Sequence, residues 1–182
     1  MLFNALYNLI AHIRYRTIVS GDQYTIRKNA SIKGRKGHIT LGKVLINENA
    51  FICCSNKGII TIEDNVTINR NTIIVSKESI SIGQGTSIGP NVCIYDHNHQ
   101  ITNDGFKKNE FSTSQITIGK NVWIGANVCI LKGSQIGDNS VISAGAVISF
   151  FVPSNSIVKN RMGLEVEKLE INHRKPRGDM NV

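Results

Sequence analysis

The chain has 182 residues, 41% of them hydrophobic, which is enough for one domain with a sizeable core. Only 6% are aromatic, so stacked rows of aliphatic side chains are expected rather than a core built around large rings. The net charge of +8 favours anionic partners such as coenzyme phosphates, acidic glycans or a membrane surface. Nucleic acid is not expected, because no basic run is interleaved with the aromatic residues that single-strand binders use.

Residues 1–20 are predicted to form an N-terminal helix. Apolar residues recur there at a spacing that makes one apolar helical face: Leu2, Phe3, Leu6, Leu9, Ile10 and Ile13. The segment is too short and too often interrupted by asparagine for a transmembrane span, and it does not have the form of a signal peptide. We expect it to pack across one end of the fold or against a neighbouring subunit, with interfacial membrane contact as the alternative.

From residue 26 to residue 158, aliphatic residues recur at every sixth position, loosely at first and later without a break. The strict series is Ile118, Ile124, Ile130, Ile136, Ile142 and Ile148. A helix repeats at about 3.6 residues and an exposed strand at about 2, so neither explains this step, whereas tandem hexapeptides do. Each unit is interpreted as a short strand plus a corner, and three units as one triangular coil. Stacked coils then bury a column of Ile and Val, which predicts an all-β solenoid in a single domain, 1–182.

The series is interrupted between Ile94 and Ile118, which are 24 positions apart, four steps of six instead of one. Residues 96–114 have the polar and glycine content of a loop, and we expect them to leave the column at one corner and return there. A long loop on a compact scaffold is more often functional than accidental. Residues 159–182 are predicted to form a short helix, around 164–171, and a disordered tail.

Two of the five histidines stand at the root of this loop, in the order Asp96-His97-Asn98-His99. Histidine is the side chain best suited to take a proton near neutral pH, and a nearby carboxylate can fix its tautomer or raise its basicity. Three alternatives remain from spacing alone. These are a surface histidine without a role, a metal-binding pair, and a turn built by Asn and Asp.

The four cysteines, Cys53, Cys54, Cys93 and Cys129, are interpreted as small buried or half-buried residues in a reducing compartment. The adjacent pair cannot readily form a disulfide, because neighbouring side chains in a strand point to opposite faces. No spacing typical of zinc ligands is present, so no metal requirement is expected. The cytoplasm is the expected location, with peripheral contact at the inner membrane face as the alternative.

The run NVWIGANVCILKGSQIGDNSVISAGAVI, followed by VPSNSIV, resembles the left-handed parallel β-helix acyltransferases with hexapeptide repeats, the group of sugar and xenobiotic O-acetyltransferases. The resemblance covers roughly residues 60–158. It alone implies the left hand, since the general rule for crossovers predicts the right hand. It also implies an acetyl-CoA-dependent O-acetyltransferase acting on a carbohydrate hydroxyl. The Asp-His-Asn-His loop root and the apolar N-terminal helix favour surface polysaccharide biosynthesis. Such enzymes are homotrimers that bind acetyl-CoA in grooves between neighbouring columns.

In that family a histidine at the loop root follows an Asn-Val-x-aliphatic repeat and acts as general base. The matching repeat here is Asn91-Val92-Cys93-Ile94, and counting onward implies His99, with His97 as its neighbour. The resemblance implies further site residues. Asn69 faces the histidine, Trp123 contacts the acceptor, and Ala126 and Ala144 lie along pantetheine. Asp96 is a further expected acceptor contact, and Ser149, Lys159 and Arg161 are further expected coenzyme contacts.

The chain departs from the family where a lysine usually stands near the coenzyme phosphates, because it reads Ser149-Phe150-Phe151 there. Lys159, Arg161 or Arg174 are the candidate substitutes. Two other functions are compatible with the same fold. A γ-carbonic-anhydrase-like zinc enzyme needs a third histidine, which His12, His38 and His173 are poorly placed to supply. A non-catalytic assembly module should have lost the loop or its histidine. A small xenobiotic or serine is the alternative acceptor.

Overall fold

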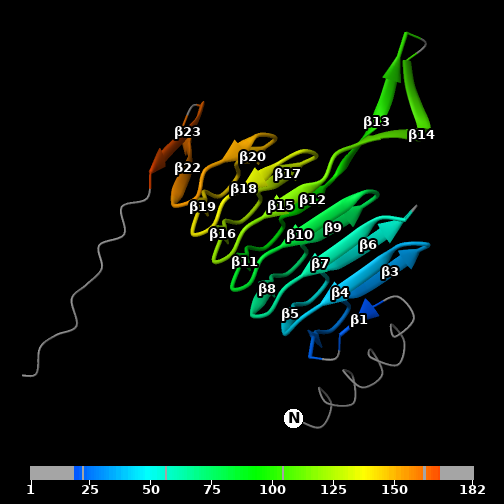
Figure 1. Cartoon of the computed structure of the whole chain (residues 1–182), viewed down its shortest axis with the longest axis horizontal. Helices are drawn as coiled ribbons and strands as arrows, with labels where there is room; N and C mark the ends of the chain where they lie inside the picture. The colour runs from blue at the N-terminus through cyan, green and yellow to red at the C-terminus, as the bar shows by residue number, and fades with distance from the viewer. Residues whose placement is uncertain (1–18, 22, 56, 104, 162, 169–182) are drawn as a thin grey trace, which may run out of the picture.

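The computed structural model describes residues 19–21, 23–55, 57–103, 105–161 and 163–168. They form an all-β parallel solenoid of about seven turns, which a left-handed hexapeptide-repeat β-helix fits. Short strands stack as three faces of one column, from β1 at one end to β22 at the other (Figure 1). The described residues include no helix.

Each coil contributes one strand to each of three sheets, which we call A, B and C in chain order. Sheet A contains β1 (Val19–Ser20), β4 (His38–Leu41), β7 (Ile59–Ile62), β10 (Ser79–Ile82), β15 (Ile116–Ile118), β18 (Gln135–Ile136) and β21 (Phe151–Val152). Sheet B contains β2 (Thr25–Ile26), β5 (Val44–Ile46), β8 (Val66–Ile68), β11 (Ser87–Ile88), β16 (Trp123–Ile124), β19 (Val141–Ile142), β22 (Ser156–Arg161) and β23 (Gly163–Lys168). Sheet C contains β3 (Ser31–Arg35), β6 (Phe51–Ser55), β9 (Ile73–Ser76), β12 (Cys93–Tyr95), β17 (Cys129–Leu131) and β20 (Val147–Ile148).

The aliphatic residues of the six-step series face the inside of the column, as predicted. Ile124 pairs with Ile88 and Ile142, and the three side chains are completely buried. Identical residues stacked at the spacing of parallel strands bury their methyl groups against one another. A single coil has no such neighbours, so the core exists only because the coils stack.

The corners of the coils are made by residues in the left-handed backbone region. Among the described residues with positive φ that are not glycine, nine are asparagine, for example Asn127 at 58° and Asn139 at 56°. Asparagine tolerates this conformation better than most residues with a Cβ. Its side chain also links the coils, since the Asn121 amide donates to Asn139 and the Asn139 amide donates to Asn155, both at 3.3 Å.

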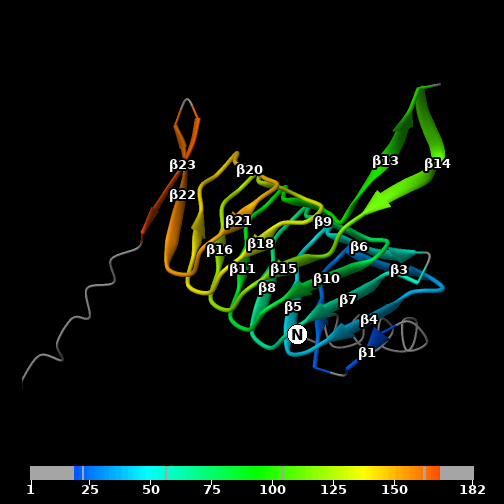
Figure 2. The same cartoon turned by 45° about the horizontal axis from the view of Figure 1, so that its top comes forward.

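The interruption in the repeats is an antiparallel hairpin rather than an irregular loop. Strands β13 (His97–Thr102) and β14 (Gly105–Thr113) pair with each other and stand away from the column (Figures 1 and 2). The hairpin is closed at its base by a hydrogen bond from the Ser114 amide to the Asp96 carbonyl, at 2.9 Å. It leaves at the corner between sheets C and A, and this corner is opposite sheet B in a triangular coil.

Both predicted terminal helices need correction where the structure describes them. Residues 1–18 lie outside the described residues, but Val19 and Ser20 form β1, which pairs with β4 instead of extending a helix. The prediction of a helix around 164–171 is wrong for 164–168, because β23 runs antiparallel to β22 and Val166 pairs with Val158. Leu164 and Val166 alternate at the period of a strand, and β22 offers the open sheet edge that such a segment can pair with. Residues 169–182 lie outside the described residues.

Candidate active site

A groove of about 480 Å³ runs across the outer face of sheet B, where β8, β11, β16 and β19 lie side by side. Its lining includes four residues that the sequence assigned to a site: Asn69, Trp123, Ala126 and Ala144. The Trp123 side chain is 60% exposed and stands on the face of the sheet between Ser87 and Val141, its partners in the adjacent strands. An exposed indole beside small residues provides a flat apolar surface on which a sugar ring can stack.

Small residues keep the groove shallow where β16 and β19 reach their corners. A Cβ placed on Gly125 would lie 2.6 Å from the backbone nitrogen of Ala144, so a larger residue cannot occupy this position without moving the corner. Ala126 and Ala144 follow on consecutive coils and are linked by a hydrogen bond from the Gly145 amide to the Ala126 carbonyl, at 2.8 Å. The result is a narrow strip that suits an extended chain such as pantetheine.

Asn69 lies at the lower end of the groove, with its amide group held in place. Its Nδ2 donates to the Ile88 carbonyl at 2.9 Å, and its Oδ1 accepts from Asn47 at 3.3 Å. Lys159 lies toward the other end, because β22 stacks on β19 with Val158 beside Ile142. The Arg161 side chain lies outside the described residues. Ser149 follows β20 on sheet C, so the structure does not bring it to the groove.

The two histidines lie on the other side of the column, on the hairpin. Asp96 is completely buried, and His97 has 13% of its side chain exposed, with Nδ1 3.0 Å from Asp96 Oδ1. His99 is more exposed, with Nδ1 3.3 Å from the Lys107 carbonyl. Within one chain, therefore, the histidines do not reach the groove that contains Asn69 and Trp123.

Asp96 is held by more partners than the sequence indicated. Its carboxylate accepts hydrogen bonds from the Ser76 hydroxyl at 2.7 Å and from the amides of Lys77 and Glu78 at 2.9 Å each. Burial alone would raise the pKa of Asp96, but the hydrogen bonds from His97, Ser76 and the two amides outweigh it and hold this pKa below its usual range. With no exposed surface in this chain, Asp96 does not line a surface that an acceptor could reach.

Sequence reasoning missed Ser76, although a signal for it was present. Every second side chain of a strand faces inward. Ile74 and Ser76 therefore lie on the same side of β9, and Ile94 of β12 and Asp96, directly after β12, lie on the same side of the next coil. Two polar residues that face inward at neighbouring positions of adjacent strands indicate a buried hydrogen bond between coils.

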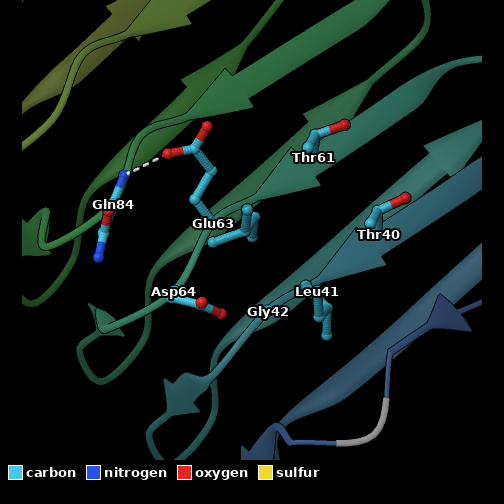
Figure 3. A pocket seen from close by; sticks show the side chains of 8 residues that line it. Thr40, Leu41, Gly42, Thr61, Glu63, Asp64 and Gln84 are labelled. Atoms are coloured by element: carbon cyan, nitrogen blue, oxygen red, sulfur yellow. Dashed lines mark hydrogen bonds between the residues drawn. The ribbon is translucent and has the colours of Figure 1, made fainter.

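A second depression, of about 390 Å³, lies at the end of sheet A beside the corner that leads to sheet B, and it was not predicted (Figure 3). Its two carboxylates accept hydrogen bonds from backbone amides of neighbouring coils. Glu63 accepts from the Gln84 amide at 2.9 Å, and Asp64 accepts from the Lys43 amide at 2.7 Å. These contacts join corners of the column, and no histidine or aromatic side chain lines the depression.

Within the described residues, no three His, Cys, Asp or Glu side chains come close enough together to hold a metal ion. In the same part of the chain, no helix has the length and apolar character needed to cross a membrane.

Comparison with known proteins places this geometry in a family. Residues 115–149 match the family described as Bacterial transferase hexapeptide (six repeats). The protein YJL218W of Saccharomyces cerevisiae, provisionally named an acetyltransferase, is 32% identical over 143 residues, which are 79% of this chain and 70% of the yeast protein. The chain belongs to the hexapeptide-repeat transferase family.

Two bacterial proteins are also similar to this chain. WbbJ of Escherichia coli K12, provisionally named a lipopolysaccharide biosynthesis O-acetyltransferase, is 34% identical over 56% of this chain and 57% of its own length. Galactoside O-acetyltransferase of the same organism is 40% identical over 51% of this chain and 46% of its own length. The chain therefore spans about half the length of these two relatives.

Solved structures of the family share the fold. The acetyltransferase VCA0836 of Vibrio cholerae, in complex with acetyl-CoA, is 26% identical with a TM-score of 0.59, covering 79% of this chain and 73% of that one. The N-acyltransferase AntD of Bacillus cereus is 20% identical with a TM-score of 0.73, covering 89% of both chains, and supports the fold alone.

Proposed function

We propose that the chain is an acetyl-CoA-dependent O-acetyltransferase that acts on a carbohydrate hydroxyl, in the biosynthesis of a surface polysaccharide. The observation that carries the proposal is the combination of an apolar groove with an exposed Trp123 and two histidines at the root of a hairpin. The relative with the highest identity reported above is named for galactoside O-acetylation, and WbbJ is named for lipopolysaccharide. VCA0836, with the same fold, binds acetyl-CoA.

The proposed coenzyme position follows from the shape of the groove. Pantetheine would extend along the strip formed by Ala126 and Ala144, with the thioester toward Trp123 and the phosphates toward Lys159 on β22. Lys159 provides positive charge at that end of the groove, and the chain has Ser149 and Phe150 after β20, where the family lysine is expected. Arg161 stays a candidate for the same role. The proposal places the protein in the cytoplasm, which supplies acetyl-CoA and keeps thiols reduced.

The proposed reaction is direct transfer. A histidine Nε2 accepts the proton of the acceptor hydroxyl while its oxygen attacks the thioester carbonyl carbon, and a tetrahedral oxyanion forms. The carbon–sulfur bond then breaks, and the leaving thiolate takes the proton back from the histidine, giving CoA and the acetylated sugar. Loss of such a base typically costs ~10²–10⁴-fold in rate. No acyl-enzyme is needed, so the cysteines have no nucleophilic role in this scheme.

The site requires more than one copy of the chain, because the histidines and the groove lie on opposite sides of the column. The outer face of sheet C supports a homotrimer. Adjacent strands place apolar and thiol side chains there in continuous rows: Phe51, Cys53, Ile73, Val75, Cys93, Tyr95, Cys129, Leu131 and Val147. The outer face of sheet A, in contrast, has hydroxyl side chains at Thr40, Thr61, Ser81 and Thr117. If three C faces meet around an axis, the corner that bears the hairpin of one copy lies near sheet B of the next.

The test is a screen for CoA release from acetyl-CoA with sugars, nucleotide sugars, oligosaccharides, serine and antibiotics as acceptors. We expect release that depends on a carbohydrate hydroxyl and a product that gains one acetyl group by mass spectrometry. Filling the strip with Ala144→Trp should abolish transfer, whereas Thr117→Trp, on the outer face of sheet A, should not. Transfer to an amino sugar nitrogen, or to serine or an antibiotic alone, would contradict the proposed acceptor. If none of the acceptors in the series leads to release of CoA, the proposed function is contradicted.

A further inference from the structure

Asp96 is a carboxylate inside a column whose interior is mainly aliphatic. It is completely buried, yet the hydrogen bonds around it use both carboxylate oxygens. Oδ2 accepts from Ser76, from the Lys77 amide and from the Glu78 amide, the three groups that hold the corner of the preceding coil. Oδ1 accepts from the Lys77 amide and faces His97. Oδ2 therefore bonds only to groups of the preceding coil, while Oδ1 also faces the imidazole of His97.

An ionised carboxylate can only accept, so it selects the tautomer of His97. Nδ1 must carry the hydrogen that it shares with Oδ1, at 3.0 Å, and this leaves the lone pair on Nε2. When Nε2 takes a second proton, the imidazolium faces the fixed negative charge of Asp96 from the side of Nδ1. The same carboxylate therefore orients the ring before the reaction and stabilises its charged form during it.

Neighbouring rings restrict the imidazole further. His97 meets Tyr95 and Phe111 edge to face, with ring centroids 6.1 Å and 5.5 Å away. Phe111 is itself held by Lys77, whose Nζ lies 3.8 Å from the ring centroid, and the Lys77 amide bonds to Asp96. The corner of one coil, the buried carboxylate and the base of the hairpin thus form one connected set of contacts around His97.

His99 lacks this support. It lies two residues along β13, on the same side as His97, and packs against Phe106 and Phe111 with centroids 4.8 Å and 4.6 Å away. Its Nδ1 is paired with a backbone carbonyl at 3.3 Å, which can select a tautomer but carries no net charge. A neutral partner stabilises an imidazolium less than a buried carboxylate does.

We propose that His97 is the general base of the transferase and that Asp96 is its positioning residue, acting through Nδ1 from inside the column. This rests on the proposed function, and it differs from the family count, which implied His99 as the base and Asp96 as an acceptor contact. His99 becomes a wall of the acceptor site.

The decisive variant is Asp96→Asn, which preserves size and removes charge. The three donors of the column gather on Oδ2, so the Asn oxygen should take that place and direct its NH₂ group toward His97. His97 Nδ1 then has to accept, its hydrogen moves to Nε2, and no lone pair faces the hydroxyl. We expect kcat to fall about 10²–10³-fold with little change in the KM for acetyl-CoA, within the range that loss of a base explains. Ser76→Ala is the matched control, because it removes a donor to the same carboxylate without touching His97.

A double-mutant cycle separates positioning from a structural role. In the His97→Ala background, Asp96→Asn should change kcat by less than about threefold. Asp96 is proposed to act on the reaction only through the imidazole of His97, which this background lacks. His99→Ala should chiefly raise the KM for the acceptor. An equal loss from Asp96→Asn in both backgrounds, or a near-normal kcat for His97→Ala beside a large loss for His99→Ala, would overturn the assignment.

Nitrogen NMR of the imidazoles provides a readout that requires neither substrate nor turnover. At a pH where the ring is neutral, His97 should carry its hydrogen on Nδ1 in the wild-type protein and in Ser76→Ala, and on Nε2 in Asp96→Asn. A wild-type His97 protonated on Nε2 would overturn the assignment. If the wild-type protein transfers acetyl to no acceptor, the proposed function fails, and the NMR experiment still decides whether Asp96 fixes the ring.

Discussion

At the scale of single residues, the inward rows of this column contain few polar groups, and those few are specialised. Cys54, Ser76 and Asp96 follow one another on successive coils beside the corner between sheets C and A. The Ser76 hydroxyl donates a hydrogen bond to the Asp96 carboxylate. In the described part of the chain, no buried side-chain nitrogen or oxygen lacks a hydrogen-bond partner. Cys54 stays in this row as a neutral thiol, because burial raises its pKa to about 11.

The raised pKa of Cys54 predicts that the free energy of unfolding falls at high pH. The folded thiol keeps its proton between pH 9 and about 11, whereas the thiol of the unfolded chain, with a pKa of 9.0, loses it. Cys54 therefore contributes stability that is fully present below pH 9 and is lost as the pH rises, by at most about 1.4 kcal/mol per pH unit. Urea unfolding at pH 8, 9 and 10 should show wild type losing stability relative to Cys54→Val. Parallel curves for the two proteins would contradict the prediction.

At the scale of elements, the hairpin β13–β14 is an addition to the column rather than a part of it. Its strands pair only with each other, and the parallel pairing of β12 with β17 and of β10 with β15 continues past it. The hydrogen bond that closes its base, between Asp96 and Ser114, is formed by residues of the corner itself. The hairpin thus carries His97 and His99 at little cost to the scaffold, as loops on repeat proteins commonly do.

Replacing residues 97–113 with two glycines should therefore remove function and preserve the fold. We expect the thermal midpoint to change by only a few degrees and acetyl-CoA to bind as before, while acetyl transfer falls to background. Calorimetry, coenzyme titration and the CoA-release assay measure the three quantities. Transfer within tenfold of wild type would remove both histidines from the mechanism, and an unfolded product would show that the hairpin supports the column.

At the scale of the whole molecule, the three outer faces of the column differ in character. Sheet B has the groove, sheet A has rows of hydroxyls, and sheet C presents apolar rows that run past several coils. Exposed apolar patches of this kind mark interaction surfaces. In the proposed function, the histidines of one copy act beside the groove of another copy. The outer face of sheet C would then be covered by other copies of the chain.

A charge on the C face should separate the copies. Leu131→Lys would place an unpaired cation in the interface, at a cost of about 3–5 kcal/mol per buried site. We expect a trimer mass for the wild-type protein by light scattering, a monomer mass for the variant at micromolar concentration, and loss of transfer with the trimer. Thr61→Lys, on the outer face of sheet A, is the matched control and should stay trimeric. A wild-type monomer that is active would exclude the shared site.

The sequence by itself determined the repeat, and with it the column. A strict step of six admits one arrangement of short strands and corners, so the inward position of Ile124 and Ile142 and the outward position of Trp123 follow from counting along the chain. The family resemblance, rather than counting, implied Asn69, Ala126 and Ala144, and these residues line one groove because the corners after Ile68, Ile124 and Ile142 stack on sheet B. The two ends of the chain were not predictable, because the step of six stops there. The pairing of residues 164–168 with β22 depends on an open sheet edge that no local pattern records.

Only the tertiary structure decided the environment of the loop root. Asp96, His97 and His99 stand within four positions of the sequence, and Asp96 was expected to contact the acceptor. Stacking instead turns Asp96 inward, where Ser76 and the backbone of residues 77 and 78, about twenty positions earlier, meet its carboxylate. Hydrogen-bond partners on neighbouring coils are fixed by the register between strands, not by separation along the chain. The family resemblance placed the histidines and the groove in one site, whereas within one chain the hairpin leaves the column at the corner between sheets C and A, opposite sheet B.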